Sequence, residues 1–176
     1  MKLKATHLLN NTITNFAHSL GCTDITFTVG KDFAYYPFDN TITYPLWQTE
    51  KTDKYFVKYL RNQDYVTIDK KLNPFILSLL HEIGHYFTIE EIEQDVLLKC
   101  FKKKQREQKR ISKRKAPLNN KQFEKKLFKY WDLPDELNAN AMALYLLKVN
   151  RKRVKQFQNE LADKFELFYK INGVKM

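Results

Sequence analysis

Glycine and proline are scarce in this chain, with four glycines and five prolines among 176 residues. A loop-rich scaffold uses both residues heavily, so their scarcity favours regular elements with short connections. A disulfide framework is not expected either, because Cys22 and Cys100 are the only cysteines, lie far apart and belong to no CxxC motif. We interpret both as reduced thiols.

Long apolar runs are also missing. The N-terminal residues contain no uninterrupted apolar stretch of the length that a signal peptide needs, and no later stretch approaches the length of a membrane span. We therefore expect a cytoplasmic protein with no membrane contact. With 43% hydrophobic and 14% aromatic residues, the chain has enough apolar side chains for a core, and we expect one domain over residues 1–176.

The order of the hydrophobic patterns predicts an α+β fold with a small antiparallel or mixed sheet. An amphipathic helix is expected over residues 3–20, with Gly21 at its end. Short β-branched and aromatic runs between residues 25 and 44 predict two or three antiparallel strands. The alternation at residues 65–69 predicts one more strand, and the stretch between, residues 45–63, is less regular.

Helices are expected to dominate the C-terminal half. Asn73 and Pro74 form a good helix start, because asparagine caps the free N–H groups and proline suits the first helical position. The helix that follows, FILSLLHEIGHYF, is almost wholly apolar, and we expect it to be buried against the sheet with its polar residues toward a cleft. Further helices are predicted over residues 89–101, 121–130, 134–149 and 151–171.

The segment HEIGH, residues 81–85, carries the chemistry. On a helix, His81 and His85 share a face at i and i+4, so both imidazoles can bind one metal ion while Glu82 acts as a general base. A shuffled chain of this composition would contain HExxH only roughly 0.4% of the time, so coincidence is a weak explanation. Gly84, which lacks a side chain, allows another backbone to pass close to the site.

A catalytic zinc uses three protein ligands and leaves a fourth position to water. The segment DELNANAMALYLL offers Glu136 as the third ligand, with Asn140 on the same helical face to hold a ligand histidine. Three alanines keep this helix thin enough to pack closely: Ala139, Ala141 and Ala143.

Simpler interpretations remain for each of these residues. His81 and His85 could be structural histidines, and Glu136 could be a carboxylate favoured by the start of its helix. Four other glutamates are alternatives as the third ligand: Glu50, Glu90, Glu91 and Glu93. His7 and His18 are expected at the surface, and Trp47 and Trp131 are expected to anchor the core or its rim.

HEIGH followed by a helix with the pattern ExxAN-x-x-A resembles the ImmA/IrrE group of gluzincin-type metallopeptidases, over about residues 65–147. The group is bacterial or carried by mobile elements, and its members often act on transcriptional repressors. The resemblance implies a minimal zincin-like fold and a bacterial or phage-infected bacterial cell. It also implies Zn²⁺ held by His81, His85 and Glu136, with Glu82 as the base and Asn140 in support.

Two further features of a peptidase are harder to locate. The developing oxyanion needs a donor, and three tyrosines could supply one: Tyr86, Tyr130 and Tyr145. A peptide substrate could add to an exposed sheet edge, for which the strand near Thr41–Tyr44 is a candidate because it precedes the site helix.

A basic insertion, at about residues 102–119, separates the two motifs. Its residues 102–115 hold one acid and nine bases, and these could contact nucleic acid or an acidic partner: Lys102, Lys103, Lys104, Arg106, Lys109, Arg110, Lys113, Arg114 and Lys115. A solvated, partly disordered charge run is the alternative.

Two functions therefore follow from the sequence. The first is a zinc metalloendopeptidase that cleaves a protein or peptide partner. The second is a catalytically silent zincin-fold module that binds nucleic acid through the basic tract.

Overall fold

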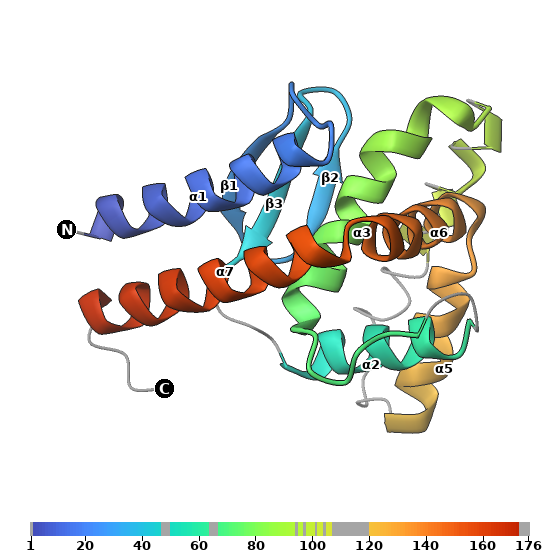
Figure 1. Cartoon of the computed structure of the whole chain (residues 1–176). Helices are drawn as coiled ribbons and strands as arrows, with labels where there is room; N and C mark the ends of the chain where they lie inside the picture. The colour runs from blue at the N-terminus through green and yellow to red at the C-terminus, as the bar shows by residue number, and fades with distance from the viewer. Residues whose placement is uncertain are drawn as a thin grey trace.

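A computed structural model describes residues 2–46, 50–63, 67–93, 95–96, 98–100, 102–103, 105–106 and 120–172. The described part is a mixed α+β structure in which helices predominate around a small sheet, as the sequence predicted (Figure 1). No helix of these ranges is long and apolar enough to cross a membrane.

The sheet has three strands: β1 (Thr26–Gly30), β2 (Ala34–Tyr36) and β3 (Thr41–Pro45). Their order is β1-β3-β2, with β1 parallel to β3 and β2 antiparallel to it. The sheet is therefore mixed, one of the two forms that the sequence predicted. The expectation that these strands are antiparallel is wrong for β1 and β3, because β3 returns between the two earlier strands instead of adding at an edge. The proposed substrate edge at Thr41–Tyr44 is wrong for the same reason, since β3 is the central strand.

The strand predicted at 65–69 does not join this sheet within the described residues. Tyr65 and Val66 lie outside them, and residues 67–69 form no strand. Asp69 instead makes a turn, in which its side chain accepts a hydrogen bond from the Lys71 N–H and its carbonyl accepts one from the Leu72 N–H. This turn leads directly into the next helix.

The first and last helices lie side by side at the edge of the molecule (Figure 1). These are α1 (Lys2–Ser19) and α7 (Arg151–Asn172). The rings of Phe16 and Phe157 stack between them, with their centroids 3.9 Å apart. Gly21 follows the end of α1 with a φ of +101°, a conformation that glycine adopts without strain.

A helix that the sequence analysis missed, α2 (Glu50–Arg61), occupies most of the stretch predicted to be irregular. It buries Phe56, Tyr59 and Leu60, which lie at helical spacing. It packs against α3 (Pro74–Thr88) and α5 (Asn120–Trp131). The prediction failed because four of the first five residues of α2 are charged, so these apolar positions are confined to the second half of the helix.

Helix α3 lies at the centre of the structure, in contact with α2, with β2 and β3, and with α6 (Pro134–Val149). A 3-10 turn, η1 (Ile89–Glu91), follows it, and the described residues from 95 to 106 are helical. The buried side chains of residues 75–80 and 83 make α3 part of the core, as its apolar sequence predicted.

Candidate metal centre

Helix α3 carries the HEIGH segment at its buried C-terminal half. Asn73 caps the helix by accepting a hydrogen bond from the Phe75 N–H at 2.9 Å, and Pro74 occupies the first helical position, as expected. His81 and Glu82 are buried, and His85 is partly buried. The motif therefore lies where bulk water is largely excluded.

Helix α6 brings Glu136 to the same place. Gly84 of α3 lies against the backbone of Ala139, so closely that an added Cβ would be 2.3 Å from the Ala139 carbonyl oxygen. Ala139 and Ala143 are fully buried, as predicted, whereas Ala141 is exposed on the outer face of α6 and takes no part in this packing. The close approach of the two helices depends on glycine at position 84.

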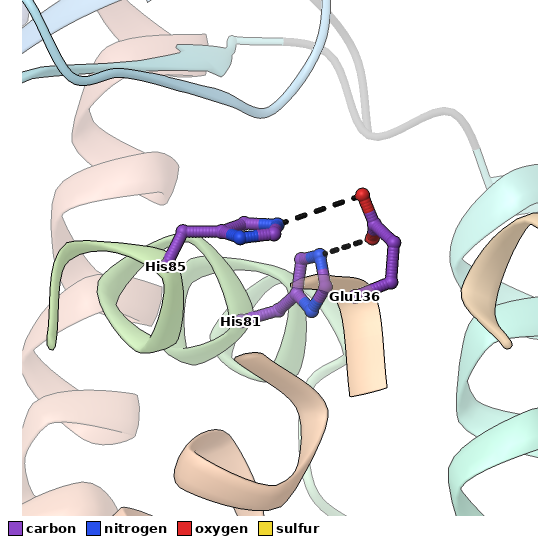
Figure 2. A group of neighbouring side chains, drawn as sticks. All are labelled: His81, His85 and Glu136. Atoms are coloured by element: carbon purple, nitrogen blue, oxygen red, sulfur yellow. Dashed lines mark ion pairs between the residues drawn. The ribbon is translucent and has the colours of Figure 1, made fainter. Parts of the chain in front are cut away.

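Three side chains converge between these helices (Figure 2). His81 Nε2 lies 3.0 Å from Glu136 Oε2, and His85 Nε2 lies 3.6 Å from Glu136 Oε1. One ligand atom from each residue lies within 4.8 Å of the others. Tetrahedral zinc, with bonds of about 2.0–2.2 Å, places its ligand atoms about 3.3–3.6 Å apart, so the group has the dimensions of a metal site.

The contact between His81 and Asn140 determines that the Nδ1 nitrogen of the imidazole carries a proton. Asn140 Nδ2 donates to the Trp131 carbonyl at 3.4 Å, so Asn140 Oδ1 is the atom that lies 2.9 Å from His81 Nδ1. Because an amide oxygen only accepts, His81 Nδ1 must carry a proton and donate it. In a neutral imidazole the lone pair of Nε2 then faces the Glu136 carboxylate.

Two acceptors at 3.0 Å repel each other unless a cation lies between them. The cation is either a second proton on His81 or a metal ion. The residues therefore fit a metal, since two imidazoles and a carboxylate are common zinc ligands and the second nitrogen of His81 has the partner that ligand histidines usually have.

The surroundings of His81 and Glu136 favour a positive charge on the imidazole and a negative charge on the carboxyl group. Burial lowers the pKa of His81, but hydrogen bonding to Glu136 and the charges of Glu136 and Glu82 outweigh it, and the pKa is raised. Burial raises the pKa of the Glu136 carboxyl, but its contacts with His81 and His85 outweigh that effect and hold the pKa well below its usual range.

An aromatic residue of α2 contacts His81. The Phe56 ring meets the His81 ring edge-on, with their centroids 5.1 Å apart. Its centroid also lies 5.1 Å from that of the Trp131 ring. Trp131 is buried in the core, as predicted. Phe56 was not predicted because α2 was not predicted, although the apolar spacing of Tyr55, Phe56, Tyr59 and Leu60 was a signal that could have identified the helix.

The remaining predicted residues lie away from this group or outside the described part. The Tyr86 hydroxyl donates to Asp24 near the sheet, Tyr145 is exposed on α6, and Tyr130 is half-buried against the core. Two rival ligands, Glu90 and Glu93, are exposed, as are His7 and His18. The side chains of Glu50, Glu91 and Trp47 lie outside the described residues.

The basic tract is described only in part. Lys102, Lys103 and Arg106 are exposed on helical residues. The other six bases lie outside the described residues: Lys104, Lys109, Arg110, Lys113, Arg114 and Lys115.

Comparisons with protein-family models, with curated proteins and with solved structures find no match to this chain. The functional interpretation therefore depends on the geometry of the site itself. Within the described ranges, His81, His85 and Glu136 form the one group of three or more histidine, cysteine or acidic side chains that could hold a metal ion.

Proposed function

We propose that this chain is a zinc-dependent metalloendopeptidase of the ImmA/IrrE-like gluzincin type, which hydrolyses peptide bonds of a protein partner such as a regulatory protein. The observation that carries the proposal is the convergence of His81, His85 and Glu136, with His81 Nε2 3.0 Å from Glu136 Oε2 in a buried site. Two imidazoles and a carboxylate are ligands that suit a divalent zinc ion, and a neighbouring glutamate within an HExxH segment is the usual base of a metallopeptidase.

His81, His85 and Glu136 would hold the zinc, and Asn140 would keep the Nε2 atom of His81 unprotonated toward it. Zinc, when bound, supplies Lewis-acid chemistry that acidifies water and polarises a carbonyl group. The Glu82 carboxylate takes the proton of the attacking water and passes it to the leaving amine. Glu82 has 8% of its surface exposed and lies close enough to His81 to raise the pKa of that imidazole. This carboxylate is therefore shielded from bulk water and close to a candidate ligand.

The test is the substitution Glu82→Gln, which removes the base and keeps the ligands. The zinc-loaded variant should retain one zinc per chain and lose cleavage, measured by mass spectrometry of new peptide termini in a bacterial lysate incubated with each protein. Equal numbers of new termini from the wild type and the variant would contradict the proposal.

The alternative, a catalytically silent module on nucleic acid, has three exposed bases in its support, Lys102, Lys103 and Arg106. Salt-dependent DNA binding that disappears when Lys102–Lys104 and Arg106 are neutralised would favour it. Absence of binding at low salt would remove it.

A further inference from the structure

The junction between α5 and α6 determines where Glu136 lies. Helix α5 ends at Trp131 and α6 begins at Pro134, so two residues, Asp132 and Leu133, separate the helices. Leu133 is the N-cap of α6 and forms no side-chain cap hydrogen bond. Since Glu136 follows in the first turn of α6, a shift of the junction shifts the ligand.

One side chain of α2 contacts both ends of this junction. The buried Tyr59 hydroxyl lies 3.0 Å from the Trp131 carbonyl oxygen and 2.9 Å from Asp132 Oδ1, within hydrogen-bonding distance of each. Its ring packs on Phe128 and Trp131 of α5, with centroid distances of 5.3 and 5.2 Å. Tyr59 therefore ties α2 to the end of α5 and to the residue that follows it.

The Trp131 carbonyl links this contact to the metal ligands. Its oxygen is one of two acceptors within reach of the single Tyr59 hydroxyl proton, and it also accepts a hydrogen bond from Asn140, whose side-chain oxygen accepts the Nδ1 proton of His81. A carbonyl oxygen has two lone pairs, so it can hold both donors at once. The chain of contacts runs from Tyr59 through a backbone carbonyl and an amide to a ligand imidazole.

We infer that Tyr59 is a positioning residue for the metal centre: its hydroxyl holds the α5–α6 junction so that Glu136 and Asn140 meet the histidines of α3. The inference rests on the proposed zinc site. It assigns a role in metal binding to a hydroxyl that belongs to neither motif and to a helix that carries no ligand. Groups one contact beyond the ligands typically change metal affinity by about 10–100-fold when removed.

The experiment compares Tyr59→Phe with Tyr55→Phe in the full chain. Each removes one tyrosine hydroxyl from α2, but Tyr55 lies one turn earlier, and its ring contacts Phe123 at 5.9 Å. Both proteins are titrated with Co²⁺, whose visible absorption reports ligand geometry, and Zn²⁺ affinity follows by competition. Tyr59→Phe should weaken Co²⁺ and Zn²⁺ binding about 10-fold and alter the cobalt spectrum, while Tyr55→Phe should match the wild type.

A merely structural role for Tyr59 would lower the melting temperature and leave the cobalt spectrum and affinity of the folded protein unchanged, which would overturn the inference. Asp132→Ala, at an exposed position, removes one of the two acceptors that compete for the single Tyr59 hydroxyl proton and should change the affinity less than Tyr59→Phe does. Wild-type affinity in both variants would equally contradict it.

Failure of the zinc proposal would look different from failure of this inference. If the wild type binds no Co²⁺ or Zn²⁺, both the proposed metal centre and the role of Tyr59 are contradicted. If the wild type binds one ion and Tyr59→Phe binds it equally well with the same spectrum, only the positioning role is lost.

Discussion

Two pairs of helices build the candidate site in different ways. Helices α3 and α6 supply all three residues that could hold a metal ion and meet through backbone, where Gly84 touches Ala139. Helices α2 and α5 supply no ligand and meet through side chains, with Tyr55 on Phe123 and an ion pair between Lys58 and Glu124. Backbone contact leaves no room for adjustment, whereas aromatic packing and a surface ion pair tolerate change. Substitutions of the candidate ligands in the first pair should therefore abolish metal binding, and substitutions in the second pair should only change its strength.

The largest effect is expected from removal of a ligand. His81→Ala takes away one of two imidazoles and leaves Glu136 without its nearest neighbour, so stoichiometric zinc binding should be lost. Metal content after dialysis against a weak chelator measures this. His7→Ala, at an exposed histidine of α1, is the control and should keep one zinc per chain.

Asn140→Ala should leave the ligands in place but remove the acceptor of the Nδ1 proton of His81. Zinc affinity should fall by about 10–100-fold, because the imidazole is no longer held in the required tautomer. Asn138→Ala is the matched control, since Asn138 lies on the exposed face of the same helix. Equal zinc dissociation constants for the two variants would exclude a role for Asn140 in metal binding.

Acidification should weaken zinc binding through His81. Because Glu136 raises the pKa of His81, a proton competes with the metal at a higher pH than it would at an ordinary imidazole. Apparent affinity should fall about tenfold per pH unit once the pH is below that raised pKa. Titrations between pH 8 and pH 5 measure the slope, and a constant affinity over this range would contradict the proposed competition.

Gly84→Ala tests the backbone contact between α3 and α6. The added methyl group would meet the Ala139 carbonyl at 2.3 Å, so the helices must separate, at a cost of about 1–3 kcal/mol in unfolding free energy. Zinc affinity should fall with it, because Glu136 moves with α6. Ala141→Ser, on the exposed face of α6, should change stability by less than about 0.5 kcal/mol.

The smallest effect is expected in the second pair of helices. Phe56→Leu removes the ring that contacts His81 and should cost about 1 kcal/mol of stability with only a slight loss of zinc affinity. Phe123→Leu removes a ring that contacts Tyr55 instead and should leave zinc affinity unchanged. A loss of affinity from Phe56→Leu as large as that from Asn140→Ala would contradict the expected difference between the α2–α5 pair and the α3–α6 pair.

The sequence predicted local features of the site well. The i, i+4 spacing of His81 and His85, the cap at Asn73 and the close approach at Gly84 follow from helix geometry and from the size of a side chain. The pairing of Asn140 with a ligand histidine was also expected from its position one turn after Glu136.

Long-range relations were predicted less well. The parallel pairing of β1 with β3 depends on where the chain returns to the sheet, and no short pattern encodes that return. Helix α2 was missed because its charged residues obscured the spacing of Phe56, Tyr59 and Leu60. The contact of Tyr59 with Trp131 joins residues far apart in sequence, so only the folded chain reveals it.

The most direct test of the metal centre is an anomalous diffraction measurement at the zinc absorption edge on crystals of the zinc-loaded protein. The account predicts a single peak within about 2.0–2.2 Å of His81 Nε2, His85 Nε2 and a Glu136 oxygen, with a fourth position open to water. No peak between these three residues would contradict the account, and a fourth protein ligand that closes the site would contradict its catalytic role.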